Sequence, residues 1–256
     1  MTTDKTKIAL VTGASRGLGK NTALALAKKG VDVILTYKSN EAEANSVVSE
    51  IEKMGGKAAA LQLDTTNIKT FDDFTARVRQ RLQEQWQTER FDFLINNAGV
   101  GIHKPFAETT EAEFDRLMNM HVKGVFFLTQ KLLSAIADGG RIVNISTGLT
   151  RFALPGYAAY ATMKGAIEVL TRYMAKELGE RQIAVNTVAP GAIETDFGGG
   201  VVRDNQQLND FIASQTALGR VGVPDDIGGA IASLLAEDIR CVNAQRIEIS
   251  GGQFLL

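Results

Sequence analysis

The sequence is poor in metal ligands and has no long apolar run. Its single cysteine, Cys241, excludes an internal disulfide. With only His103 and His121 beside that cysteine, the ligands of a structural zinc cluster are missing, and we expect no metal site. No apolar run approaches the roughly 20 residues that a membrane-spanning helix needs. The functions that remain require neither a disulfide framework nor a structural metal.

Excess charge of either sign is also missing. The chain carries 28 Lys and Arg against 29 Asp and Glu, which gives a net charge of -1. Composition therefore gives no reason to expect a nucleic acid or an anionic membrane as partner. Residues 1–5 do not lead into a signal-peptide core. We expect a cytoplasmic protein that acts on a small molecule.

Short apolar runs alternate with helical patterns along the whole chain. The alternation predicts an α/β fold with one Rossmann-type, doubly wound parallel sheet of about seven strands and helices on both faces. No repeat or linker divides the sequence, so we expect a single domain over 1–256, with a cofactor half at about 1–150 and a catalytic and lid half at about 140–256. Strands are expected at 8–11, 31–37, 58–63, 91–95, 141–145, 183–189 and 245–250, and helices at 20–29, 41–54, 71–89, 111–136, 157–178, 203–217 and from Pro224 onward.

A glycine-rich loop follows the first predicted strand directly. It reads Thr12-Gly13-Ala14-Ser15-Arg16-Gly17-Leu18-Gly19, so its glycines are spaced G-x-x-x-G-x-G rather than G-x-G-x-x-G. A strand, a glycine loop and a helix in that order form a phosphate cradle, because glycine lets the backbone approach a pyrophosphate and the helix N-terminus favours negative charge. The loop predicts dinucleotide binding.

The end of the second predicted strand is where such a fold distinguishes NADP from NAD. An acidic residue there binds the ribose 2′-hydroxyl of NAD, whereas a cation accepts the 2′-phosphate of NADP. Here Lys38 follows the strand, and no carboxylate occurs before Glu41. Lys38 and Arg16 are therefore candidates for binding the phosphate of NADP, with NAD as the alternative if both are solvated surface cations.

Tyr160 and Lys164 are four residues apart, which places them on one face of a helix. A neighbouring cation favours the phenolate and would let the phenol exchange a proton at neutral pH. Ser146 comes at the end of the apolar run 141–145, where a strand would bring its hydroxyl to the edge of a site. A tyrosine and a lysine at this spacing are usually structural, but with a serine and a cofactor loop they suit a carbonyl that must be held and protonated.

Together these motifs resemble the single-domain branch of the short-chain dehydrogenase/reductase family over essentially the whole chain. The resemblance rests on the order and spacing of T-G-x-x-x-G-x-G at 12–19, N-N-A-G at 96–99, Ser146, Y-x-x-x-K at 160–164 and Pro190-Gly191. It implies that Tyr160 is the general acid or base, that Ser146 binds the carbonyl oxygen, and that Lys164 lowers the tyrosine pKa and binds the nicotinamide ribose.

The resemblance also implies a set of cofactor-binding residues. Asp64 and Thr65 are expected at the adenine, and Ile193 and Thr195 at the carboxamide. The full expected set is Gly13, Ser15, Arg16, Gly17, Leu18, Gly19, Lys38, Asp64, Thr65, Asn96, Ala98, Gly99, Tyr160, Lys164, Pro190, Gly191, Ile193 and Thr195.

One position departs from the family pattern. In the frame N-x-x-G-x-F, where the family has a catalytic asparagine, this chain has His121. The asparagine is thought to support a water in a proton relay through the lysine. His121 either holds such a water, with a charge that could titrate near neutrality, or is a satisfied helix histidine beside a simplified relay.

The resemblance implies an NADP(H)-dependent oxidoreductase, a carbonyl reductase that interconverts a ketone or aldehyde and an alcohol. A lid at 192–217 would cover the substrate near Phe152, Leu154 and Tyr157. The alternatives are a 3-oxoacyl thioester reductase of the same family and a nucleotide-binding protein with a regulatory role. The family resemblance also implies a homotetramer. The apolar residues that could form its contacts, or could instead face the core, are Phe126, Phe127, Leu128, Leu132, Val169, Leu170 and Tyr173.

Overall fold

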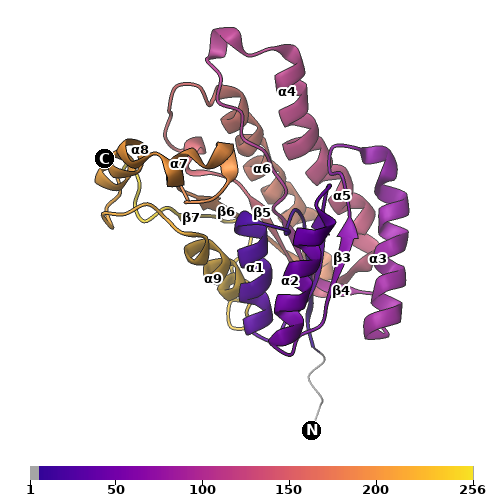
Figure 1. Cartoon of the computed structure of the whole chain (residues 1–256). Coiled ribbons are helices and arrows are strands. Elements are labelled where there is room, and N and C mark those ends of the chain that lie inside the picture. Colours follow the sequence, from indigo (N-terminus) through magenta and orange to yellow (C-terminus); the bar gives the residue numbers. More distant parts are fainter. Residues whose placement is uncertain (1–5, 256) are drawn as a thin grey trace.

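The computed structural model describes residues 6–255 and contains one seven-stranded parallel sheet (Figure 1). Its strand order, β3-β2-β1-β4-β5-β6-β7, reverses direction between β1 and β4, which creates a crevice at the carboxyl ends of the strands. The predicted Rossmann-type fold is confirmed. Residues 1–5, which the signal-peptide argument used, lie outside the described part. The strands are β1 (Ile8–Val11), β2 (Asp32–Tyr37), β3 (Ala58–Gln62), β4 (Phe91–Asn96), β5 (Ile136–Ile145), β6 (Ala184–Pro190) and β7 (Arg246–Ile249).

Helices cover both faces of the sheet, and each face has its own apolar cluster (Figure 1). Alternate residues of β1 point to opposite clusters: Ala9 and Val11 to one, Ile8 and Leu10 to the other. No helix within residues 6–255 is long and apolar enough to cross a membrane. The first face carries α1 (Gly17–Lys28), α2 (Glu41–Lys53) and α9 (Pro224–Leu234), and the second carries α3 (Phe71–Trp86), α5 (Gly124–Leu132) and α6 (Ala158–Glu177).

The helix expected at 111–136 is broken in the structure. It starts as α4 (Glu111–Met118), widens into a π-helical turn at Asn119–Lys123, and continues as α5. A 3-10 turn at Leu133–Ala135 follows, and the chain enters β5 at Ile136, which pairs with Phe91 of β4. Only the last residue of the predicted helix is therefore strand. The wide turn matters for the site because it contains His121.

The expected lid helix at 203–217 is two short helices, α7 (Val201–Asp204) and α8 (Gln206–Ser214). Before them, Gly198, Gly199 and Gly200 all have positive φ, of 63°, 81° and 78°. Only glycine adopts that conformation readily, so these three residues form the turn that leads into α7. The predicted helix itself is broken at Asn205, whose backbone is extended, with φ -104° and ψ 101°. Both short helices lie beside the ends of β6 and β7 (Figure 1).

Candidate active site

The loop between β1 and α1 is built for close approach of a ligand to its backbone. A β-carbon on Gly19 would lie 2.3 Å from the Gly13 carbonyl oxygen, so no larger residue fits. Gly13 and Gly17 have positive φ, and a β-carbon on Gly17 would meet nothing within 4 Å. The loop therefore faces open space at the N-terminus of α1, which fits a pyrophosphate.

Asn97, which the sequence analysis did not assign, fixes this loop. Its Nδ2 donates to the carbonyl oxygens of Thr12, at 2.9 Å, and Gly13, at 3.1 Å. The Thr12 hydroxyl in turn accepts from the backbone nitrogens of Asn97 and Ala98. The second asparagine of the N-N-A-G motif was the sequence signal for this role. Neighbouring side chains of an extended segment point in opposite directions, so the two asparagines contact different partners.

The side chain of Asn96 braces the sheet instead of lining the cofactor crevice. Asn96 is buried, and its Nδ2 donates to Thr129 of α5 and to Asn144 of β5. Asn144 then donates to Thr171 of α6, which also accepts from Thr187 of β6. These bonds join five elements, β4, α5, β5, α6 and β6, and satisfy polar groups that would be costly to bury alone.

The two cations assigned to the 2′-phosphate differ in their surroundings. Lys38 forms a 2.8 Å ion pair with Asp64, whereas exposed Arg16 has no ion pair within residues 6–255. Partial burial would raise the pKa of Asp64, but hydrogen bonds from Lys38 and Thr66 outweigh it and lower that pKa. The Thr65 hydroxyl points inward to Met120 at 3.0 Å, so only Asp64 of the expected adenine pair presents its side chain near Lys38.

Tyr160 and Lys164 lie on one face of α6, and both are buried. Lys164 Nζ donates to the Ile145 carbonyl oxygen at 2.7 Å and lies 5.6 Å from the Tyr160 ring centroid. Burial lowers the pKa of Lys164 to about 7 and, with a smaller contribution from Tyr157, raises the pKa of Tyr160 above its ordinary value. The structure thus opposes the expectation of an acidified phenol, because burial disfavours the charged form of Tyr160.

His121 is neutral and enclosed. Its ring is only 1% exposed and packs edge-on to Tyr160, with centroids 5.4 Å apart. Nε2 lies 2.8 Å from the Val100 carbonyl oxygen and must carry the proton there, which leaves Nδ1 as a buried acceptor without a partner among the described residues. Burial, followed by the charge of Lys164, lowers its pKa to about 3. Titration near neutrality, one of the sequence-based alternatives, is therefore wrong.

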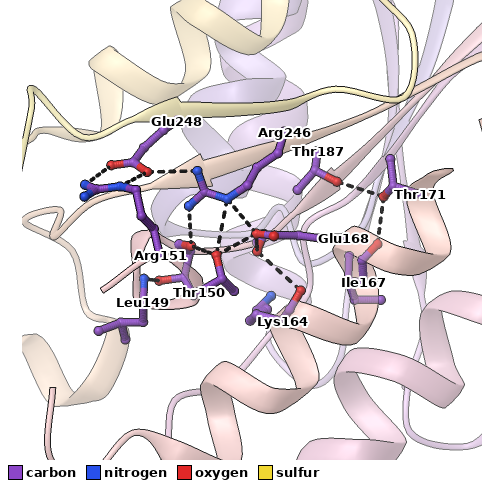
Figure 2. A network of polar contacts seen from close by, with 12 residues as sticks. Leu149, Thr150, Arg151, Lys164, Ile167, Glu168, Thr171, Thr187, Arg246 and Glu248 are labelled. Atoms are coloured by element: carbon purple, nitrogen blue, oxygen red, sulfur yellow. Dashed lines mark hydrogen bonds and ion pairs between the residues drawn. The ribbon is translucent and has the colours of Figure 1, made fainter. Parts of the chain in front are cut away.

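The Ser146 hydroxyl is already hydrogen-bonded to a residue of α6 that follows Lys164. It donates to the Glu168 carboxylate at 2.7 Å, one helical turn beyond the lysine and two beyond Tyr160. The same carboxylate oxygen accepts from the Thr150 hydroxyl at 2.7 Å and from Arg246 Nε at 2.8 Å (Figure 2). The expectation that this hydroxyl faces a substrate is not met, because its hydrogen already has a charged acceptor.

Arg246 connects this carboxylate to the C-terminal segment. Its guanidinium also donates to the Thr147 carbonyl oxygen at 3.2 Å and to Glu248 at 2.8 Å (Figure 2). Glu248 is paired on its other side with Arg151, whose hydrogen bond is the main cause that lowers the Glu248 pKa to about 2. Charges of alternating sign thus fasten the turn after β5 to β7.

A pocket of about 400 Å³ lies beside the tyrosine helix. Leu149 and Tyr157, which line it, also pack against the cluster that contains Tyr160. Leu154 lines the pocket as expected, but Phe152 does not, because its ring packs on Phe254 with centroids 4.8 Å apart. The full lining is His103, Pro105, Phe106, Leu149, Ala153, Leu154, Pro155, Gly156, Tyr157, Ala158 and Ala161.

The segment after β6 brings the remaining expected residues to the same edge of the sheet. Pro190 ends β6, and the Gly191 nitrogen donates to Ile249 of β7. Ile193 forms a bridge with Gly222, and Thr195 is buried with its hydroxyl accepting from the backbone of Phe197. The start of the lid is therefore fixed to the body of the domain.

The apolar residues considered for subunit contacts divide into a buried set and an exposed set, with Phe127 and Leu170 half-buried between them. Leu128 and Leu132 belong to the core, which excludes them from a surface. Phe126, Val169 and Tyr173 are 44%, 45% and 65% exposed, on α5 and α6. Only the second set is available to another subunit.

Comparisons with known proteins identify the family of the chain. A family model described as "Enoyl-(Acyl carrier protein) reductase" matches residues 13–253. Hydroxynaphthalene reductase-like protein Arp2 of Metarhizium brunneum is 37% identical, over 96% of this chain and 94% of its own length. The promiscuous reductase LugOII, which catalyses keto-reduction at C1 during lugdunomycin biosynthesis, has a TM-score of 0.92 at 37% identity, covering 98% of this chain and 99% of its own.

A further solved structure is that of the landomycin C-6 ketoreductase LanV with bound NADP and rabelomycin. It has a TM-score of 0.88 at 36% identity, with 98% of this chain and 97% of the LanV chain covered. The family model and these relatives match almost the whole length of the chain. The chain belongs to the short-chain dehydrogenase/reductase family of oxidoreductases.

Proposed function

We propose that this protein is an NADPH-dependent reductase that converts a polycyclic aromatic ketone into an alcohol, with Tyr160 as proton donor. The observation that carries the proposal is the position of Tyr160: a buried phenol that packs with Leu149 and Tyr157, which line an apolar pocket of about 400 Å³, in a fold that also has a glycine cradle for a dinucleotide. Such a cofactor supplies the hydride, and the protein supplies orientation and the proton.

The loop from Gly13 to Gly19 would hold the pyrophosphate, and Arg16 with Lys38 the 2′-phosphate. Support comes from the geometry of the loop, from the absence of a carboxylate at the end of β2 before Glu41, and from the NADP found in LanV. Ile193 and Thr195 would lie at the carboxamide, and Lys164, one turn after the tyrosine, would bind the nicotinamide ribose. NADH is the competing cofactor in the experiment below.

The raised pKa of Tyr160 favours the reductive direction. A buried phenol that keeps its proton at neutral pH is ready to donate it to a carbonyl oxygen as hydride arrives. No hydrogen bond within residues 6–255 occupies the Tyr160 hydroxyl, so it is available to a substrate. Oxidation of an alcohol would first require the phenolate, which burial disfavours.

Thr147, not Ser146, would hold the substrate oxygen. Consecutive residues of extended backbone point in opposite directions, and Thr147 has φ -161° and ψ 155°. Its Oγ1 accepts from the Leu149 nitrogen at 3.4 Å, and no acceptor for its own hydrogen is recorded within residues 6–255. Thr147 therefore keeps a donor for a carbonyl, whereas Ser146 donates to Glu168.

The pocket suits a flat aromatic substrate. Tyr157 and His103 form one wall, with ring centroids 4.8 Å apart, and most of the other lining residues are apolar. Flat rings pack well against such a wall. The Arp2 relative is named for hydroxynaphthalene reduction, and the LanV structure contains rabelomycin. These two relatives support a fused-ring ketone over a 3-oxoacyl thioester, although the matching family model is described by an acyl-carrier reductase.

His121 would act as a neutral acceptor that holds a water beside Lys164. Its unpartnered Nδ1 supports this role, and its lowered pKa argues against a charged imidazole.

Two further expectations stay predictions: a cytoplasmic location, and a homotetramer that would use the exposed Phe126, Val169 and Tyr173. Light scattering at micromolar concentration tests the tetramer, and a monomer would exclude it.

Mixing the protein with NADPH or NADH and a panel of ketones tests the function. Loss of absorbance at 340 nm with bicyclic and larger aromatic ketones, faster with NADPH, is the expected result. Turnover only with 3-oxoacyl thioesters would replace the substrate class. Cofactor binding without turnover of any carbonyl would support the regulatory alternative.

A further inference from the structure

Phe197 of the lid packs against a glycine that follows β4. A β-carbon built on Gly101 would lie 2.7 Å from Cε1 and 2.8 Å from Cζ of the Phe197 ring, closer than real carbon contacts allow. The two residues are far apart in the sequence, and their contact closes the gap between the segment after β4 and the segment after β6. Any side chain at position 101 would have to displace the ring.

The same ring covers the tyrosine expected to donate the proton. The Tyr160 and Phe197 ring centroids are 5.9 Å apart, with the planes inclined at 55°. Tyr160 is only 7% exposed, whereas Phe197 is 46% exposed. The phenylalanine therefore forms part of the wall between Tyr160 and solvent while leaving nearly half of its own apolar surface open.

The backbone is fixed before Phe197 and consists of glycines after it. Before it, the Thr195 hydroxyl accepts from the Phe197 nitrogen at 3.2 Å, and Ile193 pairs with Gly222. After it come the three glycines 198–200, all with positive φ. Glycine crosses between backbone conformations with little steric penalty. The Gly199 nitrogen donates to the Asp196 carbonyl oxygen at 3.1 Å, so the ring moves only when this glycine turn around Phe197 changes shape as a unit.

We propose that Phe197 and Gly101 together determine the size of the ketone that reaches Tyr160. The ring of Phe197 occupies the space that a side chain at 101 would otherwise fill, and the glycines after it set how far the ring withdraws. This inference rests on the proposed reductase function and assigns its size selection to two residues. Phe197 is a specificity-determining residue and takes no part in the proton transfer.

Replacing each residue tests the proposal through selectivity. Phe197→Ala should raise kcat/KM for a tetracyclic ketone relative to a bicyclic one by about tenfold, the scale on which pocket volume discriminates substrates. Phe211→Ala is the matched control, because Phe211 lies on α8 of the same lid and is 53% exposed. An unchanged ratio in Phe197→Ala, or an equal change in both variants, would overturn the proposal.

The contact itself is tested by a double-mutant cycle. Gly101→Ala should lower kcat/KM in the parent but much less in the Phe197→Ala background, where no ring remains to clash. Gly229→Ala is the matched control, since a β-carbon there meets nothing within 4 Å. Equal losses from Gly101→Ala in both backgrounds would show that Phe197 is not the residue displaced.

Two measurements work without turnover. Calorimetry of both ketones binding to the complex with NADP should show the same change in selectivity for Phe197→Ala.

The protein has one tryptophan, Trp86, so a variant that combines Trp86→Phe with Phe197→Trp carries its only tryptophan on the lid. Adding Gly101→Ala should raise its quenching by acrylamide, and unchanged quenching would contradict the contact. A parent protein that reduces no ketone would instead refute only the proposed function.

Discussion

The hydroxyl of Ser146 donates to the carboxylate of Glu168 across 2.7 Å, while the neighbouring Thr147 keeps its hydroxyl hydrogen free of any recorded acceptor in residues 6–255. Adjacent residues of one turn thus have different tasks. Ser146 belongs to the charged network that fastens the turn after β5 to β7, and Thr147 keeps a donor for the proposed substrate.

Separate substitutions distinguish these tasks. Thr147→Val should lower kcat by about 10²–10³, the usual cost of removing a hydrogen-bond donor to a developing oxyanion. Ser146→Ala should leave kcat nearly unchanged and lower the free energy of unfolding by about 1–3 kcal/mol, because Glu168 loses a buried donor. Steady-state kinetics and urea unfolding measure both effects. A large loss of kcat in Ser146→Ala alone would return the catalytic role to the serine.

His121 makes stability depend on pH in a defined direction. Its pKa is about 3 in the folded protein, against an ordinary value of 6.5. Below pH 6.5 the unfolded chain binds the proton first, so stability falls as pH drops toward 3 and is insensitive to this group above 6.5. At about 1.4 kcal/mol per pKa unit, the loss is about 2 kcal/mol at pH 5.

His121→Asn removes this dependence. Urea unfolding of both proteins at pH 7 and pH 5 isolates it, because the other titrating groups are common to the two chains. The parent should lose about 2 kcal/mol more than the variant between the two pH values. Equal losses would mean that His121 takes up a proton in the folded protein with little penalty.

Arg16 and Lys38 should contribute unequally to cofactor choice. Lys38→Ala should weaken NADPH binding more than NADH binding, and Arg16→Ala should do so more strongly, because Lys38 already has Asp64 as a partner. Charge-assisted hydrogen bonds of about 1.5–3 kcal/mol imply a loss of about 10- to 100-fold for the better-placed cation. Fluorescence titration measures each affinity. Equal losses for both nucleotides would assign the tested cation to the surface.

Much of the fold follows from local sequence signals. Apolar runs such as 8–11 coincide with strands because each is short and bounded by turn residues. The glycine loop predicted a helix after β1, although α1 begins at Gly17, inside the loop, and not at 20. The chain is helical over nearly all of the predicted range 111–136, but apolar periodicity does not reveal the π-helical turn at His121 or the pairing of Ile136 with β4. Pairing between strands is a long-range property that a local pattern does not contain.

The site was harder to predict than the fold. The sequence identified the segment 146–164, but a spacing of four does not reveal how deeply Tyr160 and Lys164 are buried, and burial reversed the expected shift of the tyrosine pKa. Motifs could not predict that Glu168 accepts the hydrogen bond of Ser146. The Glu168 carboxylate is held in place by Arg246, which lies 78 residues further along the chain. The sequence analysis did not assign Thr147. The alternation of side-chain direction along extended backbone is the one signal that points to it.

The most direct test of the account is Tyr160→Phe, which removes one hydroxyl and keeps the ring that packs on His121 and Phe197. Turnover of an aromatic ketone that the parent reduces and NADPH affinity should be measured on the same preparation. We predict that turnover is lost while NADPH binding is nearly unchanged. Full turnover in the variant would contradict the assignment of Tyr160 as proton donor.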